Sequence, residues 1–117
     1  MEVNAQEIDE SFVQECANAL DLTFSQRYEE AIPVYENIIA TLKKQNSSPE
    51  NMAIWLKGLG TCKLYTGKTG EAENIYLEAL KSIDAPQYAN AKIVRQLLDA
   101  LSVLYVQTQN YEKANKY

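Results

Sequence analysis

The side chains that most often carry out chemistry in proteins are scarce in this sequence. It has no His and only two Cys, Cys16 and Cys62, which lie far apart and form no CxxC pair. Most zinc, copper and haem ligand sets need His or clustered Cys, so we expect no metal and no other cofactor. Nothing places a perturbed carboxylate, Cys or Lys beside a nucleophile, so we predict no catalytic residues. The two thiols are expected to be buried as small apolar side chains.

One short motif superficially suggests phosphate binding. Residues 66–70 read Thr-Gly-Lys-Thr-Gly. A phosphate loop also needs a glycine separated from Gly67 by four residues and a strand before it, and that position is Cys62. Adjacent acidic residues such as Glu29 and Glu30 point in different directions on a helix, which is typical of a solvated surface. The sequence therefore predicts a protein that is not an enzyme.

Composition favours one mostly helical domain. The 117 residues are 46% hydrophobic with only 4 Gly and 3 Pro, and apolar residues recur three and four positions apart. The 11 Lys and Arg against 16 Asp and Glu give a net charge of -5, which makes nucleic acid and anionic membrane poor partners. No signal peptide and no apolar stretch of about 18 residues is seen, so we expect a cytoplasmic protein.

An internal repeat is the main signal. A shift of 41 residues places one apolar stripe on another: Ala31 on Ala72, Val34 on Ile75, Tyr35 on Tyr76, Ile39 on Leu80 and Leu42 on Ile83. A shift of 42 continues the pattern, with Leu56 on Leu98, Leu59 on Leu101, Leu64 on Val106 and Ala72 on Ala114. Small residues recur at one equivalent position, namely Ala19, Gly60 and Ser102. Internal duplication is the economical explanation.

Start and stop signals divide each unit into two helices. Ser48 is expected to cap a helix that has Pro49 in its first turn, Gly67 to end that helix, and Thr69 to cap the next one. Pro33 should bend its helix or delay its start. The predicted helices are 5–23, 27–45, 49–66, 70–83, 86–108 and a last one from 111, capped by Asn110.

Close helix packing explains the small residues. Gly60 on one helix and Ala72 on the next are expected to touch backbone to backbone, with Leu59 and Tyr76 filling the space beside them. A single hairpin of this kind cannot bury both faces, so neighbouring hairpins must stack to complete the core.

The middle unit resembles the tetratricopeptide repeat family. The resemblance is carried by Leu59, Gly60, Gly67, Ala72, Tyr76 and Ala79, with the family's small-small-aromatic-small spacing. The period of 41 to 42 is similar to the longer repeats of kinesin light chains. The resemblance implies an all-α solenoid of about two and a half antiparallel hairpins, in one domain over 1–117 with units 5–45, 49–83 and 86–117. We expect the chain to be part of a longer array.

In this family the first helix of each hairpin lines a concave binding surface. The matching positions here are Val13, Cys16, Leu20, Ile54, Lys57, Thr61, Leu64, Gln96, Asp99 and Val103. The apolar members could instead pack against adjacent helices, so Lys57, Thr61, Gln96 and Asp99 are the better contact candidates. The resemblance implies a scaffold that binds a protein or peptide segment in the groove. Two alternatives stay open: a peptide-sensing regulatory domain, as in some bacterial regulators, and a structural subunit of a larger complex.

Two further expectations concern partners. Family members that hold acidic chaperone tails use a clamp of cations and amides, whereas Cys16, Leu20 and Gly58 occupy such positions here, so we expect weak or no binding of those tails. The open C-terminal end should expose Leu104, Tyr105, Ala114 and Tyr117, which predicts self-association through that end.

Overall fold

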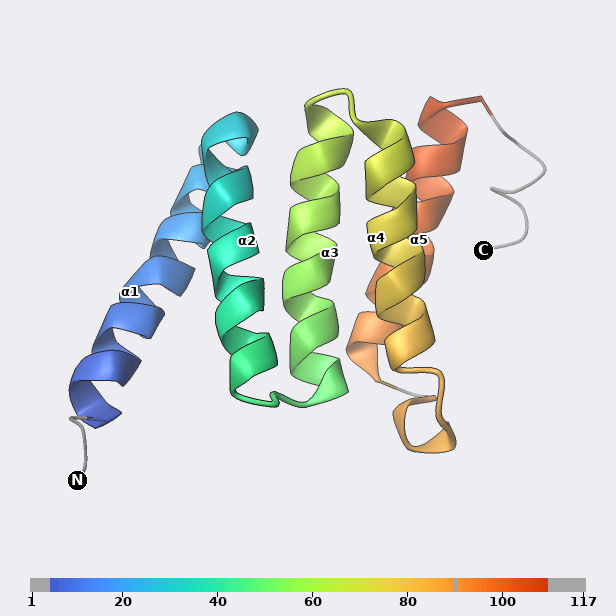
Figure 1. The fold of residues 1–117 in the computed structure, drawn as a ribbon. Helices are drawn as coiled ribbons and strands as arrows, with labels where there is room; N and C mark the ends of the chain where they lie inside the picture. Colours follow the sequence, from blue (N-terminus) through green and yellow to red (C-terminus); the bar gives the residue numbers. More distant parts are fainter. Residues whose placement is uncertain (1–4, 90, 110–117) are drawn as a thin grey trace.

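Five α-helices follow one another along the chain in the computed structural model, which describes residues 5–89 and 91–109. They are α1 (Ala5–Phe24), α2 (Tyr28–Lys44), α3 (Pro49–Tyr65), α4 (Thr69–Ser82) and α5 (Lys92–Gln107), with a short 3-10 helix, η1 (Pro86–Tyr88), before α5. Figure 1 shows α1 to α4 side by side in a row, each running opposite to the one before, and α5 beside α4. No strand occurs in the described ranges, so the all-helical prediction is confirmed there.

The two hairpins turn in the same way. After α1 and after α3 the chain passes through one left-handed residue, Gln26 (φ 61°) or Gly67 (φ 84°). The next residue then donates its N–H back into the helix, from Arg27 to Leu22 O and from Lys68 to Lys63 O, each over 2.8 Å. This is the Schellman arrangement, which satisfies carbonyls that the helix end would leave unpaired. The turn predicted at Gly67 is therefore confirmed.

The cap predicted at Thr69 is wrong. Lys68 takes the N-cap position of α4 with no side-chain hydrogen bond, and Thr69 is already the first helical residue. The reason is that the Schellman turn leads straight into α4, whose first bond runs from Ala72 N–H to Lys68 O. Arg27, the N-cap residue of α2, has almost the same backbone angles as Lys68, so the two repeats match in backbone conformation as well as in sequence.

The start of α3 agrees with the sequence. The side chain of Ser48 accepts a hydrogen bond from the backbone N–H of Asn51, and Pro49 lies in the first turn. Proline is well suited to this position because its missing N–H would have had no partner in the helix. The helix is thus fixed at its N-terminus by a polar cap and at its C-terminus by Gly67.

The helix predicted over 86–108 is broken in the structure. Tyr88, Ala89 and Ala91 donate their N–H groups to carbonyls three residues earlier, which gives the tighter 3-10 geometry of η1 and the turn after it. Only at Lys92 does α5 begin, after an extended Ala91 that supplies no side-chain cap. The tighter backbone lets Tyr88 pack against the core while α5 starts afresh.

Pro33 does not delay its helix. Because α2 begins at Tyr28, the proline lies inside it, and its exposed ring causes no break. The helix predicted to start at Tyr111, with its cap at Asn110, lies outside the described residues.

The core runs continuously between the helices, with α3 at its centre. α3 packs against α2 on one side and α4 on the other, and it also contacts α5. Its buried residues are accordingly spread around the helix: Ala53, Leu56, Leu59, Gly60, Cys62 and Leu64. Neighbouring hairpins therefore do complete each other's cores.

Glycines on α3 make room for aromatic rings. The atoms nearest to a Cβ placed on Gly60 all belong to the ring of Tyr76 on α4. Tyr76 thus fills the space beside Gly60 as predicted, Ala72 is fully buried in the same core, and the backbone contact between Gly60 and Ala72 stays a prediction. Gly58 faces the ring of Tyr35 on α2 in the same way. Each side of α3 therefore receives one tyrosine.

The row of helices gives an elongated shape. Its Cα radius of gyration is 15.1 Å, with extents of 54 × 35 × 18 Å. A compact chain of this length would have a radius of gyration of about 13 Å. Repeat architectures grow along one axis in this manner because each unit contacts only its neighbours.

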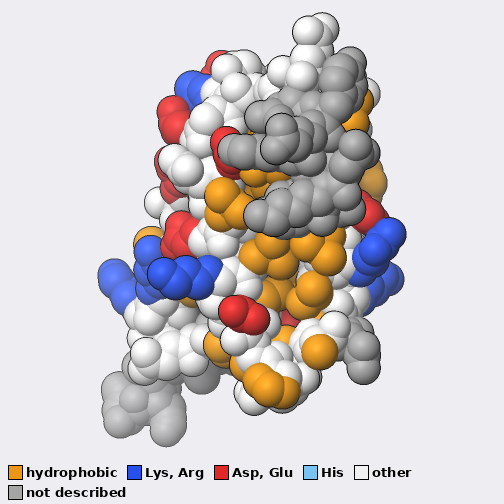
Figure 2. Space-filling view, turned by 90° about the vertical axis from the view of Figure 1, so that its right-hand side faces the viewer, with side chains coloured by type: hydrophobic (Ala, Val, Ile, Leu, Met, Phe, Trp, Pro, Cys, Tyr) orange, Lys and Arg blue, Asp and Glu red, His pale blue; other side chains and the backbone are white. Residues whose placement is uncertain are grey.

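At the end of the row, α5 turns its apolar residues Leu97, Leu101, Leu104 and Tyr105 inward. Figure 2 looks at the α4–α5 side, where hydrophobic side chains gather in the middle of the face and charged ones lie mostly towards its edges. Leu104 and Tyr105 are nevertheless only 2% and 3% exposed, so the prediction that they meet water is wrong. Tyr105 donates its hydroxyl to Glu73 of α4 over 2.6 Å. Ala114 and Tyr117 lie outside the described residues, and self-association stays a prediction.

Candidate functional site: an inner groove along α1, α3 and α5

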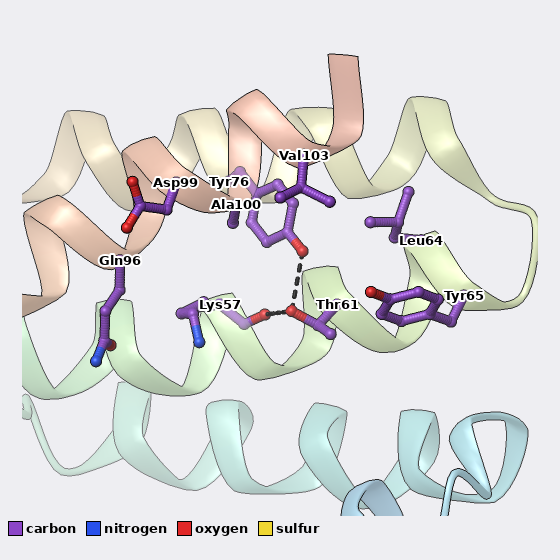
Figure 3. Close-up of a pocket in the computed structure, with 9 residues that line it drawn as sticks. All are labelled: Lys57, Thr61, Leu64, Tyr65, Tyr76, Gln96, Asp99, Ala100 and Val103. Atoms are coloured by element: carbon purple, nitrogen blue, oxygen red, sulfur yellow. Dashed lines mark hydrogen bonds between the residues drawn. The ribbon is translucent and has the colours of Figure 1, made fainter. Parts of the chain in front are cut away.

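A pocket of about 300 Å³ lies between α3 and α5, and we call it the Tyr76 pocket. Its lining is Lys57, Thr61, Leu64 and Tyr65 from α3, Tyr76 from α4, and Gln96, Asp99, Ala100 and Val103 from α5. Figure 3 shows Gln96, Asp99 and Lys57 towards one end of this pocket, and Leu64 and Tyr65 towards the other. The pocket thus has a polar end and an apolar end.

A second pocket of about 300 Å³ lies beside it, towards α1, and we call it the Trp55 pocket. Its lining is Leu20 and Thr23 from α1, Tyr35 from α2, Ile54, Trp55, Lys57, Gly58 and Thr61 from α3, and Gln96 from α5. Lys57, Thr61 and Gln96 belong to both pockets. The two pockets therefore join into one inner groove that crosses three helices.

The structure brings most of the predicted site residues together. Lys57, Thr61, Leu64, Gln96, Asp99 and Val103 all line the Tyr76 pocket, and Leu20 lines the Trp55 pocket. Cys16 lines neither of these pockets. It is partly exposed rather than buried, so the expectation of a buried thiol holds for Cys62 and is wrong for Cys16.

The apolar candidates divide into two kinds. Leu64 is 7% exposed and packs into the core, which agrees with the alternative that apolar candidates pack against adjacent helices. Leu20 and Val103 are 46% and 45% exposed, which leaves much of each side chain available for contact. Ile54 has a similar exposure and lines the Trp55 pocket. The groove therefore offers apolar surface from each of its three helices.

Two hydrogen-bonded hydroxyls form the floor of the Tyr76 pocket (Figure 3). Thr61 donates its hydroxyl proton to Lys57 O over 2.9 Å, and its oxygen lies 2.9 Å from the hydroxyl of Tyr76. A threonine hydroxyl has one proton, so Tyr76 must donate in the second bond. Burial raises the pKa of Tyr76 to about 12. The floor is thus neutral and fixed in orientation.

The Trp55 pocket has a matching floor. Thr23 donates to Ala19 O over 2.8 Å, and its hydroxyl oxygen lies 3.0 Å from the hydroxyl of Tyr35, which therefore donates to it. The Tyr35 ring packs against Trp55 at a centroid distance of 5.9 Å and an angle of 49°. Burial raises the pKa of Tyr35 as well. Both floors are polar at one buried point and aromatic around it.

The predicted site residues do not include the aromatic residues that line the two pockets. Tyr35 and Tyr76 are buried, as their places in the apolar stripes predict, and each also lines one pocket. Tyr65 is 51% exposed and stacks on Tyr28 with ring centroids 5.1 Å apart. Trp55 follows Ile54 on α3, and adjacent residues point in different directions on a helix, so the pattern of inner positions gave no signal for Trp55.

The groove holds no arrangement typical of catalysis among its described residues. Asp99 pairs with Arg95 across 3.4 Å on the exposed side of α5. The Gly-Lys-Thr of residues 67–69 forms the α3–α4 turn rather than a phosphate loop. Within residues 5–89 and 91–109, no three His, Cys, Asp or Glu side chains gather as a metal site would require. The arrangement is suited to holding a ligand by shape and a few polar contacts.

A row of antiparallel helical hairpins stacked on one another defines a helical-repeat protein. The family profile described as Tetratricopeptide repeat matches residues 13–84, which is more than half of the chain. The chain therefore belongs to the tetratricopeptide repeat family and is an all-α solenoid of that type. Members of this family generally mediate protein–protein contacts and are typically not enzymes.

The other comparisons add no relative. No curated protein and no solved structure matches the chain closely enough to count as one. None of the helices in the described residues has the length and hydrophobicity needed to cross a membrane.

Proposed function

We propose that this protein is a protein–protein interaction scaffold that binds a segment of a partner protein in the inner groove. The observation that carries the proposal is the joining of the two pockets through Lys57, Thr61 and Gln96. A groove that spans three helices suits an extended or helical segment better than a small molecule, because contacts recur along its length.

The composition of the groove supports the same function. Recognition surfaces tend to combine large amphipathic side chains with a few polar anchors. Tyr65 and Trp55 supply the first kind of contact, and Gln96 and Lys57 supply the second. The fixed hydroxyls of Thr61 and Tyr76 keep the floor ordered, so less conformational freedom is lost on binding.

We also propose that the repeats belong to the longer variety that resembles kinesin light chains. Left-handed residues end the first helix of each unit at Gln26, Gly67 and Gln109, at intervals of 41 and 42 residues. The usual repeat of this family is 34 residues long. Because the groove crosses the helices, longer helices would make the groove wider.

The test is a selection of peptides from a random displayed library, followed by binding to two variants. Val103→Arg places a charged chain in the apolar end of the groove and should weaken binding by about tenfold or more. Leu77→Arg is the matched control, because Leu77 on α4 is also partly exposed and lines neither groove pocket. Equal loss in both variants, or no selected peptide, would contradict the proposal.

A further inference from the structure

Two lysines of α3, Lys57 and Lys63, differ in whether an acidic side chain pairs with them. Of the lysines in the described ranges, Lys57 and Lys63 are partly buried and the others are exposed. Lys63 lies 2.8 Å from a carboxylate oxygen of Glu71 and 3.9 Å from one of Glu36. Lys57 has no salt bridge or side-chain hydrogen bond with any described residue. Lys63 therefore has counter-charges among the described residues, whereas Lys57 is also partly buried and has none there.

The position of Lys57 in the groove indicates what its ammonium group could bind. It lies where the Tyr76 pocket and the Trp55 pocket meet. On one side are the exposed apolar surfaces of Val103 and Tyr65, and on the other those of Leu20 and Ile54. The groove thus presents, in order, an apolar pocket, a positive charge and a second apolar pocket.

Charges near Lys57 do not neutralise it. Asp99 lines the same pocket, but its carboxylate lies 3.4 Å from Arg95 and forms no salt bridge with Lys57. Thr61 and Tyr76 are already bonded to each other and to the backbone. Any segment that covers the groove would remove water from the ammonium. An acidic group on the segment would offset that loss most fully, because it supplies both a hydrogen-bond acceptor and a counter-charge.

We propose that the groove binds an extended segment with an internal Asp or Glu between two large apolar side chains. This inference rests on the proposed function and specifies the partner's chemistry. The carboxylate would pair with Lys57, with Gln96 beside it as an amide donor, while one apolar side chain enters each pocket. A single cation suits one side-chain carboxylate rather than a cluster of acidic groups.

The test uses short synthetic peptides with blocked ends, so that no terminal charge competes. One set carries a central Glu with Leu or Trp at varied offsets on both sides, and matched sets carry Gln or Lys at the centre. The best Glu peptide should lose about fivefold in affinity when Glu becomes Gln, as expected for one partly exposed ion pair. It should also bind more weakly at high salt.

Charge reversal then assigns the effect to one residue. Lys57→Glu should weaken the Glu peptides and strengthen the Lys peptides, whereas the exposed control Lys81→Glu on α4 should change neither. Equal binding of Glu and Gln peptides, with Val103→Arg still abolishing both, would overturn this inference and leave the scaffold function intact. Failure of every set to bind the groove would count against the scaffold function itself.

Discussion

The ring of Tyr76 on α4 lies so close over Gly60 on α3 that a Cβ at Gly60 would be 2.6 Å from its Cε1 atom. Real Cβ atoms do not come this near to an aromatic carbon, so the contact requires glycine. The ring cannot move aside easily, because Tyr76 is 1% exposed and its hydroxyl is held by Thr61. This contact joins the two helices of the middle repeat and also fixes the floor of the groove.

Replacing Gly60 by Ala should therefore destabilise the fold. We expect the free energy of unfolding to fall by about 1–3 kcal/mol, as for other overpacked cores, measured by urea denaturation. Gly70→Ala is the control, because nothing lies within 4 Å of a Cβ there and Ala favours the helix. It should be neutral or raise stability by up to about 1 kcal/mol. Equal effects of the two substitutions would show that the Tyr76 contact is not tight.

Substitutions at the two left-handed turn residues, Gly67 and Gln26, should change the stability of the fold in opposite directions. Gly67 has φ 84° and open space around it, so Gly67→Ala should cost about 1 kcal/mol through backbone strain alone. Its repeat equivalent Gln26 already bears that strain at φ 61°, and Gln26→Gly should raise stability by up to about 1 kcal/mol. Thermal or chemical unfolding measures both. A gain from Gly67→Ala would contradict the turn geometry.

The buried phenol of Tyr76 predicts a loss of stability at alkaline pH. Its pKa is raised to about 12 in the folded chain, from about 10 when unfolded. Below pH 10 both states are protonated and the stabilisation is complete, and it is lost as pH rises towards 12 because the unfolded chain ionises first. The wild type should lose about 2 kcal/mol more than Tyr76→Phe by pH 12.

The measurement is urea denaturation of both proteins at several pH values from 9 to 12. Tyr35 acts in the same direction, since burial also raises its pKa. Adding Tyr35→Phe to Tyr76→Phe should therefore flatten the pH profile further. Parallel profiles for the wild type and Tyr76→Phe would be inconsistent with a raised pKa at this residue.

The two thiols should differ in reactivity. Cys62 is fully buried, whereas Cys16 is partly exposed. Burial raises the pKa of both thiols, and Glu15 adds to the rise at Cys16, so neither is strongly nucleophilic at neutral pH. With an aromatic disulfide reagent near pH 8, one thiol should react in the native protein and the second only in denaturant. Cys16→Ser should remove the native reaction, and two fast thiols in the wild type would contradict the buried position of Cys62.

The predictions that held from sequence depend on local signals. The Ser48 cap, the turn at Gly67 and the apolar stripes of α2 and α4 are each set by residues within one or two helical turns. The candidate site residues of α3 and α5 line shared pockets because they occupy equivalent places in a repeat, and equivalent places face the same side of a regular stack; their role in binding stays a prediction. Lys57 and Asp99 lie one repeat length apart in the sequence and therefore line the same pocket.

The failures occurred where packing between helices overrides local preference. Residues 85–91 contain Pro86 and Asn90, which favour turns, but Pro86 is equally suited to the first turn of a long helix, so the prediction began that helix there. Thr69 is a good cap by type, yet the preceding turn had already placed Lys68 there. The predicted site residues also leave out Tyr65 and Trp55, which line the two pockets, since a stripe of apolar residues does not say which aromatic side chains stay accessible.

By itself the sequence determined that this chain forms stacked helical hairpins, because the spacing of apolar and small residues admits no other way to bury its surface. Only the tertiary structure decided that Gly58 accommodates Tyr35, that two pockets meet at Lys57, and that Leu64 is covered while Val103 stays open. The reason is physical: helical periodicity selects the side of a helix that faces inward, whereas exposure and charge pairing depend on the exact approach of helices distant in sequence.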